Sequence, residues 1–575
     1  MIRTSITIGG KRIYDNDFTS VSISQSVGGH HSFTISLKQD AVSGVLMEKT
    51  DSWIGQPIII GVDNTKEEDI AFSTVTEVFK GVVTAMGLSR QRGTAELVVK
   101  GASPTIMLDD GPHTRSFTNK GVQEIVDEVM KPYNDAFPEA PETEPKNFTD
   151  PLDYCVQYKE SNFTFLTRLA NRYGEWFYYD GLNMYFGKPP EEDAIPLDFG
   201  EDSLDFFDIS VVALPAKFEM RGYDYLKHEP LSIQAPQSTK SSELGEKVIG
   251  IAKQKIYTQV PSVSLQTAFE KGEFENLVKR REQINLDETV ILNGSSRNPK
   301  LKIGAKIDVN DDVVGEAYGE FIIIDISHTI GQAGDYNNFF KAIPVEVTTP
   351  PLTGMPNPPF CETQLAEVTS VEDEDGLGRI KVKFLWQEGS EEESPWLRVA
   401  SPYTGKDKGF YITPEVEDNV LVAFENNNPN KPYVLTSMYS GGAVPELFDA
   451  KNNFKGIKSK GQNQIKFDDD EQSTTIYAPT NITVNAGDTI TLNVDDSKII
   501  ITKNEISINT KIISIVATDS LTISSSSITM GNGDASCSSM DLTGTTINIT
   551  GSSAVNITGG GGTVKATGGQ VKLNS

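Results

Sequence analysis

Two short acidic runs in this 575-residue sequence contain residue types that catalysis or metal binding could use. The first, "FDDDEQ", holds the carboxylates from Asp468 to Glu471, and paired carboxylates can hydrolyse a glycosidic bond. That chemistry needs two carboxyl groups facing each other across a cleft, whereas consecutive residues at a turn mostly face water. We therefore interpret this run as a solvent-exposed turn.

The second run, "EDEDGLGR" at residues 372–379, resembles the start of a calcium-binding loop. It lacks the later ligands and the closing Glu that such a loop needs, so we predict a hairpin turn. "GASPT" and "GGGG" lack the Lys and the Ser or Thr of a phosphate loop. No nucleophile–base constellation is visible, and triads formed by distant residues stay open.

Five histidines and three cysteines show no metal-ligand spacing. His30 and His31 are adjacent on a predicted strand, where successive side chains point to opposite faces and cannot chelate one ion together. His113, His228 and His328 are isolated, so structural or surface roles are expected for them. The cysteines are expected to be buried or inert thiols of a reducing compartment; they are Cys155, Cys361 and Cys537. We predict no catalytic residue, no metal site and no cofactor.

The formal net charge of −29 at pH 7 argues against two classes of partner. Nucleic-acid binding needs Lys and Arg concentrated on one face, and docking on anionic lipid is disfavoured for the same reason. The N-terminal "MIRTSITIGG" lacks the apolar core of a signal peptide, and runs such as "QPIIIGV" are too short to span a bilayer. We expect a cytoplasmic protein unless something other than a signal sequence exports it.

Period-two alternation predicts β-barrel lobes at about residues 1–100 and 200–350, with an α/β insertion at about 101–190. In the insertion, one helix is expected from residue 122, capped by Thr118 or Asn119. A second helix is expected between Ser161 as N-cap and Gly174 as C-cap. A hairpin turn is expected at Asp180-Gly181.

The second lobe is predicted to contain one amphipathic helix, near "SLQTAFEKGEFENLVKRREQIN", and a buried strand at "FIIIDISHTIG". A Pro-rich connector then precedes a compact β unit at residues 361–440. There Ile380, Val382 and Phe384 alternate with Arg379 and other basic residues, which is typical of a half-buried strand in a small barrel. Residues 441–464 are predicted to be a linker, too short to fold a catalytic domain.

From residue 465 to 575 short apolar pairs recur mostly every seven to nine residues. A strand of about five residues plus a turn cannot close a hydrophobic prism alone, and an open meander would expose its edges. Three copies wound together would close those edges, so we predict an intertwined homotrimeric β-helix. The pairs begin at Ile482, Ile490, Ile499, Ile506, Ile513, Leu521, Ile528, Met540, Ile547, Val555, Val564 and Val571.

Several collinear segments resemble the VgrG family, the valine–glycine repeat spike proteins of type VI secretion systems, which are similar to contractile phage tail hubs and spikes. Among them are "VQYKESNFTFLTRLANRYGEWFYYDGLNMYFG", "DISHTIGQAGDYNNFFKAIP", "DGLGRIKVKFLW" and "KGQNQIKFDDDEQSTTIYAP". The resemblance covers essentially the whole chain. The tail departs from the family because Thr/Ser/Asn-Ile units replace Val-Gly repeats, so the needle prediction rests on the period and the turn residues.

The resemblance implies a mainly β fold with α+β insertions. Its parts are a phage-tail-hub-like region at 1–360, an OB-fold collar at 361–440, the linker at 441–464 and a trimeric β-helix (β-prism) spike at 465–575. The implied function is a homotrimer on an Hcp-type tube that punctures target envelopes mechanically and is exported without a signal peptide. Implied partners are baseplate proteins and effectors with their chaperones. The positions where relatives carry an enzyme hold none here, so no enzymatic activity is predicted.

A PAAR-repeat protein is implied as the cap of the tip. At the end of a prism three chain termini would expose strand edges and a last apolar layer, a seat for such a cap, with a frayed terminus as the alternative. The predicted docking residues are Gly569, Gln570, Val571, Lys572, Leu573, Asn574 and Ser575.

Two other hypotheses stay open. The chain could be the spike of a contractile phage tail or an extracellular injection particle, which the proteins bound to the hub would decide. It could also be a β-helical polysaccharide-degrading enzyme, which requires turnover that is lost on substitution of Asp468 or Asp469. The acidic collar lacks a basic, aromatic-studded groove, so we expect it to pack between hub and needle rather than to bind nucleic acid or sugar.

Overall fold

The computed structural model describes residues 3–14, 17–38, 46–63, 76–91, 94–137, 139, 141–200, 203–238, 240–268, 271–332, 335–351, 359–389 and 392–526. The chain divides into two compact units, unit 1 from Met1 to Glu446 and unit 2 from Leu447 to Ser575. Strands hold 44% of the described residues and helices 15%, which confirms the predicted mainly β class.

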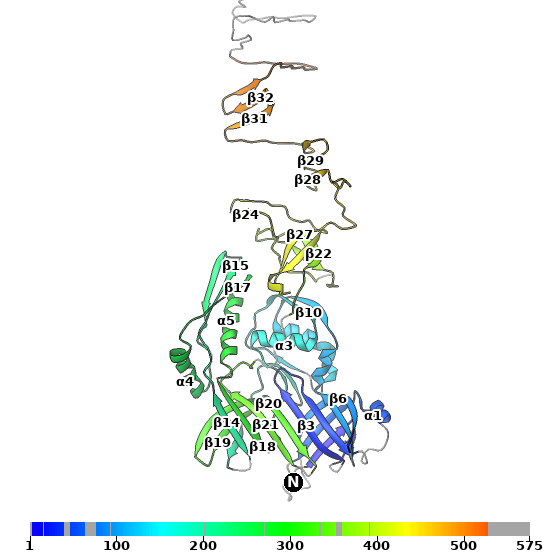
Figure 1. The fold of residues 1–575 in the computed structure, drawn as a ribbon, viewed down its shortest axis with the longest axis vertical. Coiled ribbons are helices and arrows are strands. Elements are labelled where there is room, and N and C mark those ends of the chain that lie inside the picture. Colours follow the sequence, from blue (N-terminus) through cyan, green and yellow to red (C-terminus); the bar gives the residue numbers. More distant parts are fainter. Residues whose placement is uncertain are drawn as a thin grey trace, which may run out of the picture. The chain divides into compact units, whose positions relative to one another are not determined.

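A 13-stranded sheet brings together strands from both predicted lobes (Figure 1). Its strands are β1 (Arg3–Ile8), β2 (Lys11–Ile13), β3 (Phe18–Ser26), β4 (Ser32–Lys38), β5 (Pro57–Asp63), β6 (Thr76–Gln91), β7 (Thr94–Ala102), β13 (Ile195–Phe199), β14 (Phe206–Val211), β18 (Val290–Ser296), β19 (Lys306–Asp311), β20 (Glu316–Gly331) and β21 (Tyr336–Pro344). Their order is β14-β18-β21-β20-β3-β4-β7-β6-β5-β1-β2, with β19 on β20 and β13 on β19. A short helix, α1 (Leu46–Trp53), precedes β5.

The ladder between β3 and β20 connects the N-terminal strands to those of the second lobe. It runs antiparallel from Asp325 opposite Ser26 to Gly331 opposite Ser20, and we call it the seam. In β3 alternate residues are buried, so one face packs on the core. In β20 residues 321–324 are all buried, which confirms the predicted buried strand.

The α/β insertion follows β7. Its elements are η2 (Pro104–Asp109), β8 (His113–Lys120), α2 (Val122–Met130), η3 (Lys131–Ala136), β9 (Glu142–Glu144), β10 (Leu152–Glu160), α3 (Asn162–Tyr173), β11 (Phe177–Tyr179) and β12 (Met184–Gly187). The predicted caps of α3 are confirmed: Ser161 Oγ accepts a hydrogen bond from the Thr164 amide, and Gly174 has φ +75°. The β11–β12 hairpin turns at Asp180-Gly181, as predicted.

The predicted cap of α2 is wrong. Thr118 and Asn119 belong to β8, which runs to Lys120 and pairs with β10. Gly121 is the N-cap instead, and the Glu124 carboxylate accepts a hydrogen bond from its amide at 2.8 Å. Strand pairing therefore overrides the local preference of a polar side chain for the cap.

The second lobe contains two α-helices among its described residues, not one. They are α4 (Glu243–Ile251), continued by a π-helical turn η4 (Ala252–Ile256), and α5 (Lys271–Leu286). A small sheet beside them has the order β16-β15-β17, from β15 (Glu219–Asp224), β16 (Glu229–Gln234) and β17 (Ser262–Ala268). The first residues of the predicted helix form β17, because this segment pairs with β15 in parallel. Helix α5 packs against α3 (Figure 1).

The collar sheet has the order β23-β22-β26-β27, formed by β22 (Gln364–Ser370), β23 (Lys381–Phe384), β26 (Asn419–Phe424) and β27 (Pro432–Ser437). A small hairpin of β24 (Thr404–Gly405) and β25 (Lys408–Gly409) and a turn η5 (Glu425–Asn427) complete its described elements. Its core includes Ile380, Val382, Phe384, Val420 and Val422, all at most 1% exposed. The alternation predicted around Val382 and Phe384 builds part of this core, and β26 alternates in the same way.

Unit 2 contains two three-stranded antiparallel sheets among its described residues. The first consists of β28 (Phe454–Lys458), β29 (Gln464–Asp468) and β30 (Ser473–Tyr477). The second consists of β31 (Thr489–Val494), β32 (Ser497–Thr502) and β33 (Ile506–Asn509). Strand β28 lies within the predicted linker, residues 441–464. The intertwined trimeric β-helix stays a prediction.

Candidate functional site

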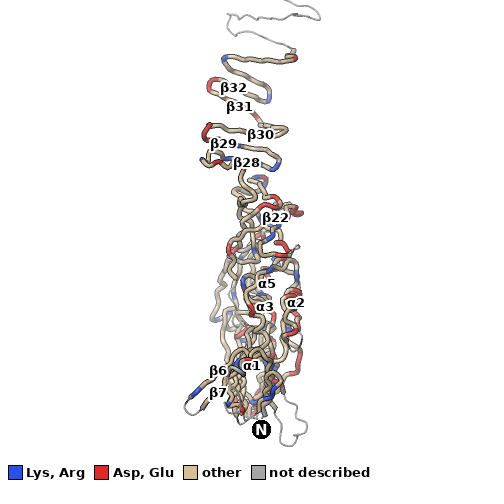
Figure 2. Tube along the Cα trace, turned by 90° about the vertical axis from the view of Figure 1, so that its right-hand side faces the viewer, with Lys and Arg blue, Asp and Glu red and all other residues tan. Residues whose placement is uncertain are grey.

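The strands of unit 2 present large apolar side chains to solvent. Ile476 is 62% exposed, Leu492 58% and Ile506 69%. Among the described residues after Val434, no side chain is buried. Acidic residues gather at the turns of these hairpins (Figure 2). We call the apolar residues of this region the needle surface; they include Ile457, Ile465, Phe467, Ile476, Tyr477, Ile482, Val484, Leu492, Val494, Ile506, Ile508, Ile512, Ile513, Ile515, Val516, Leu521 and Ile523.

A needle surface of this kind is not stable as a single layer in water. A three-stranded sheet needs a covered hydrophobic face for independent stability, and its outer strands carry unpaired backbone groups. Exposed apolar patches on a protein mark surfaces that bind a partner, a membrane or a ligand. The needle surface is therefore a candidate interaction surface.

The collar has a second apolar patch on the loop that carries β24 and β25. Tyr411 is 80% exposed, Ile412 58% and Tyr403 55%. The loop is closed by the hydrogen bond from the Phe410 amide to the Tyr403 carbonyl at 2.8 Å. Its aromatic side chains lie outside the buried core cluster of the collar, and Lys408 Nζ lies over the Tyr403 ring, 5.6 Å from its centroid.

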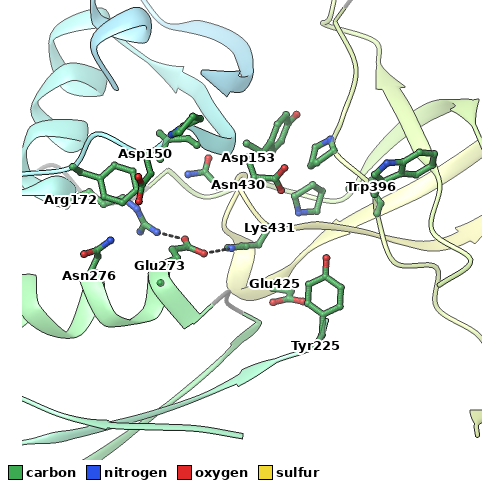
Figure 3. A pocket seen from close by; sticks show the side chains of 18 of the residues that line it. Asp150, Asp153, Arg172, Tyr225, Glu273, Asn276, Trp396, Glu425, Asn430 and Lys431 are labelled. Atoms are coloured by element: carbon green, nitrogen blue, oxygen red, sulfur yellow. Dashed lines mark hydrogen bonds and ion pairs between the residues drawn. The ribbon is translucent and has the colours of Figure 1, made fainter. Parts of the chain in front are cut away.

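Hub and collar meet at a cavity of about 260 Å³ (Figure 3). Glu273 of α5 lies in its wall and joins two cations. Arg172 Nη2 of α3 lies 2.8 Å from Glu273 Oε1, and Lys431 Nζ of the collar lies 2.7 Å from Glu273 Oε2. One carboxylate, on α5, thus pairs with a cation on α3 and with Lys431, the collar residue that directly precedes β27.

Further contacts fasten the same junction. The Val156 amide donates to Asn430 Oδ1 at 2.8 Å, and Gln387 Nε2 donates to Ser116 Oγ at 2.7 Å. Glu362 accepts hydrogen bonds from the hydroxyl of Tyr158 and the ammonium of Lys159, at 2.6 and 3.0 Å, and these lower the pKa of Glu362 to about 2. These hydrogen bonds and ion pairs hold the collar on the hub insertion.

The two acidic runs singled out in the sequence are both turns. Asp468–Glu471 joins β29 to β30, where Asp468 Oδ1 accepts a hydrogen bond from the Glu471 amide at 3.2 Å. Lys455 pairs with Asp469, and Lys466 Nζ lies 3.6 Å from Asp468 Oδ2. Asp468 and Asp469 thus have lysines of the same small sheet as partners.

The run at 372–379 is the turn between β22 and β23, as predicted. Asp373 accepts hydrogen bonds from the Arg379 guanidinium and from the amides of Arg379 and Leu377, and those from Arg379 lower the pKa of Asp373 to about 2. Arg379 is 6% exposed, so the expectation that it faces outward from a half-buried strand is wrong. The turn folds Asp373 over its guanidinium.

His30 and His31 lie in the turn between β3 and β4, not on a strand, and contact different partners. His30 Nε2 lies 2.9 Å from Asp109 Oδ2, and His30 Nδ1 lies 2.9 Å from Thr105 Oγ1. Carboxylate, imidazole and hydroxyl follow the order of a catalytic triad. Thr105 is only 2% exposed, so no substrate reaches its hydroxyl, and the three side chains fasten the turn to η2.

The other histidines have local partners. His113 Nε2 lies 2.8 Å from Asp110 Oδ1, and His228 Nδ1 lies 2.5 Å from the Tyr223 hydroxyl. His328 is fully buried. Within the part of the chain that the structure describes, no three His, Cys, Asp or Glu side chains converge on a possible metal site.

The remaining predicted residues divide between described and undescribed regions. Cys155 and Cys361 are buried free thiols, and burial raises the pKa of Cys155 to about 11. Cys537, the "GGGG" segment and the second half of the apolar repeat lie outside the described residues. So do all seven predicted docking residues, Gly569 to Ser575. No helix of the described ranges has the length and apolarity to cross a bilayer.

Two features of the site have no signal in the sequence. One is the Arg172–Glu273–Lys431 cluster, whose members come from two helices and a collar turn. The other is a series of hydrogen-bonded, buried polar side chains at the seam, which includes Gln25 and His328. Each residue looks ordinary in its own segment, because spatial convergence is what gives it a role.

Comparison with protein families gives two matches. Residues 30–334 match the phage tail baseplate hub (GPD), and residues 364–439 match the type VI secretion system/phage-baseplate injector OB domain. The solved Francisella PdpA-VgrG complex, half-lidded, has a chain that aligns with a TM-score of 0.54 at 9% identity, over 88% of each chain. This structural likeness concerns the fold alone.

Curated relatives agree with these matches. The type VI secretion system spike protein VgrG1a of Pseudomonas aeruginosa is 23% identical, over 63% of this chain and 61% of its own. The actin cross-linking toxin VgrG1 of Vibrio cholerae is also 23% identical, over 56% of this chain and 32% of its own. The chain thus covers less than two thirds of the length of these relatives.

Proposed function

The chain belongs to the phage tail baseplate hub (GPD) family, and from that premise we propose that it is the hub and spike subunit of a type VI secretion system. Its resemblance to VgrG proteins is confirmed, and curated relatives such as VgrG1a are type VI secretion spike proteins. An OB domain of the injector type follows the hub region. This succession supports a structural subunit that links a tube to a spike.

The spike is a homotrimer in this proposal, and the needle surface is the observation that carries it. Leu492, Ile506 and their neighbours have no covering layer among the described residues of their own chain. Three identical copies arranged around one axis would bury these side chains and pair the free strand edges. The needle would therefore become stable only on assembly.

The proposed partners follow from the two ends of such a spike. An Hcp-type tube protein and baseplate proteins contact the hub, a PAAR-repeat protein caps Gly569–Ser575, and effectors with their chaperones travel as cargo. The protein is made in the cytoplasm and leaves with the contracting machine, so that it meets the target membrane during puncture. Its acidic balance of charge supports a role without nucleic acid.

The role is structural and not enzymatic in this proposal. The carboxylates of Asp468 and Asp469 contact lysines in a hairpin turn, and the Thr105 hydroxyl is buried. A glycan panel incubated with the full chain should show no turnover. Turnover that is lost in Asp468→Asn would favour the polysaccharide-degrading alternative.

The decisive test measures the mass of the purified full chain at micromolar concentration and its binding to a hexameric Hcp-type tube protein. A trimer that binds the tube is expected. A folded monomer would contradict the needle proposal, and selective binding to a phage tail tube instead would favour the phage-tail alternative. Deletion of Gly569–Ser575 should abolish binding of the tip protein and leave the trimer intact.

A further inference from the structure

A chain of buried polar side chains crosses the seam between the two lobes of the large sheet. Tyr336 Oη lies 2.7 Å from His328 Nδ1, and His328 Nε2 lies 2.9 Å from Gln25 Oε1. Gln25 Nε2 lies 3.1 Å from His31 Nδ1, and His31 Nε2 lies 3.3 Å from the Ser26 carbonyl. Gln25 and the two histidines are at most 1% exposed and Tyr336 is 3% exposed.

The donors and acceptors along this series of hydrogen bonds fix which atom carries each proton. The Ser26 carbonyl can only accept, so His31 Nε2 carries a proton and Nδ1 accepts from the Gln25 amide. The Gln25 oxygen can likewise only accept, so His328 Nε2 carries a proton and Nδ1 accepts from the Tyr336 hydroxyl. Both imidazoles are therefore neutral, and all donors point along one direction.

One more proton has no place in this arrangement. On His31 it would face the Gln25 amide group, and turning that amide would place its N–H groups against the proton of His328. On His328 it would point at the Tyr336 hydroxyl, whose oxygen already accepts from Asn338 Nδ2 at 3.1 Å, so the hydroxyl hydrogen would have to turn away from its acceptor, His328 Nδ1. An added proton therefore either sets buried donors against each other at Gln25 or takes its acceptor from the Tyr336 hydroxyl, and both changes are costly in a dry core.

No neighbouring carboxylate compensates this cost among the described residues. The groups that act electrostatically on His31 are His30 and His328, both of which oppose its protonation. The rings of Tyr179 and Phe79 face His31, and Tyr336 faces His328. Burial lowers the pKa of both histidines, from 6.5 to about 3.

We propose that the seam is an acid-sensitive fastener, closed at neutral pH and opened when protons enter this hydrogen-bond chain. The seam ladder joins β3 to β20, the strands that carry Gln25 and His328. Loss of these hydrogen bonds therefore weakens the pairing of β3 with β20 before it weakens the hydrophobic cores of the two lobes. This inference does not depend on the trimer, because all of its residues belong to unit 1.

The sign follows from linkage. Each histidine binds a proton readily only in the opened state, so closure is fully favoured above pH 6.5 and is lost as pH falls below it. At pH 5 each histidine should shift the equilibrium toward opening by about 30-fold, and the pair by about 1,000-fold. Asp287 of unit 1 acts in the opposite sense, because burial raises its pKa to about 8, so the seam must be measured locally.

The experiment is hydrogen exchange of the full chain at pH 7.5 and pH 5, corrected for intrinsic exchange. Amides of β3 and β20 should lose about 1,000-fold more protection than amides of β22 and β26. The collar is an internal control, since all five histidines precede residue 329. An equal loss of protection in seam and collar would overturn the proposal.

Two variants sharpen this test. His328→Gln keeps an acceptor and a donor but does not titrate, so the extra loss at the seam should fall from about 1,000-fold to about 30-fold. His228→Gln, at an exposed turn, should leave the full loss unchanged. If His328→Gln does not fold, His31→Gln replaces it, and the wild-type comparison of seam with collar still decides. A full 1,000-fold loss in a folded variant would contradict the assignment.

Discussion

Collar and unit 2 use strands of similar length and alternation, yet their apolar faces have different surroundings. In β26 Val420 and Val422 are fully buried between neighbouring strands and the rest of the collar core. In β31 Leu492 and Val494 are 58% and 77% exposed. Strands of the collar and β10 of the hub insertion thus complete one core within unit 1, whereas unit 2 has a surface that needs a layer from outside its described residues.

The difference shows why alternation alone does not say where a core lies. An alternating strand needs a cover on one face, and that cover can come from the same chain or from another copy. In the collar the cover comes from other collar strands and from Tyr154, Val156 and Tyr158 of β10. The meanders of unit 2 pair each strand with its sequence neighbours and leave both faces uncovered.

The largest expected effect comes from charging the needle surface. In the full chain, Ile506→Asp with Ile508→Asp should weaken trimer formation on the order of 10,000-fold or more, because six carboxylates per trimer would replace apolar side chains at the proposed interface. Sedimentation or mass photometry over a concentration series measures this. Ser507→Asp, on the opposite face of β33, is the matched control and should stay within several-fold of wild type. Equal effects of both changes would remove the distinction between the faces.

The second largest effect is expected on the stability of the collar, from loss of the buried ion pair between Asp373 and Arg379. Asp373→Asn leaves the guanidinium of Arg379, 8% exposed, without its buried partner, so collar stability should fall by about 3–5 kcal/mol. Hydrogen exchange of β22 and β23 amides reports the loss. The Asp375 side chain, which is 67% exposed, is the second partner of Arg379. Asp375→Asn should therefore cost about 1 kcal/mol or less. Similar losses in the two variants would contradict the role given to Asp373.

Acid should reveal the same ion pair in the wild-type collar. Asp373 has a folded pKa of about 2 against an ordinary value of 3.8, so its contribution of about 2.5 kcal/mol is present above pH 3.8. That contribution is lost as pH falls through 2. Urea titrations at pH 5 and pH 2.5 should show a smaller loss of collar stability in Asp373→Asn than in wild type. A parallel loss in both proteins would show that the carboxylate is not the titrating group.

The smallest effect is expected at the joint between hub and collar. Glu273→Gln removes the charge that Arg172 and Lys431 share, and should cost the junction about 1–2 kcal/mol. Faster exchange of amides in residues 430–434 would record it. Glu275→Gln on the same helix, whose pair with Lys271 spans 3.9 Å, should change little. If Glu275→Gln has the same effect, the junction depends on overall charge and not on this cluster.

Features governed by neighbours in sequence were predictable. Ser161 and Gly174 bound α3 as predicted, because capping depends on a side chain and a backbone angle within one turn. The turn at 372–379 formed as predicted for the same reason. The caps proposed for α2 failed, since pairing of β8 with β10 extends that strand to Lys120.

The sequence by itself determined the mainly β class, the family resemblance and the lack of a local catalytic motif. Only the tertiary structure decided that Glu273 joins two hub helices to the collar, and that Gln25 contacts His328, a residue 303 positions away. The physical reason is the sequence distance over which each interaction acts. Alternation, helix caps and turns depend on residues only a few positions apart. Buried ion pairs and hydrogen-bond chains depend on how distant strands and helices align, and no single segment records that alignment.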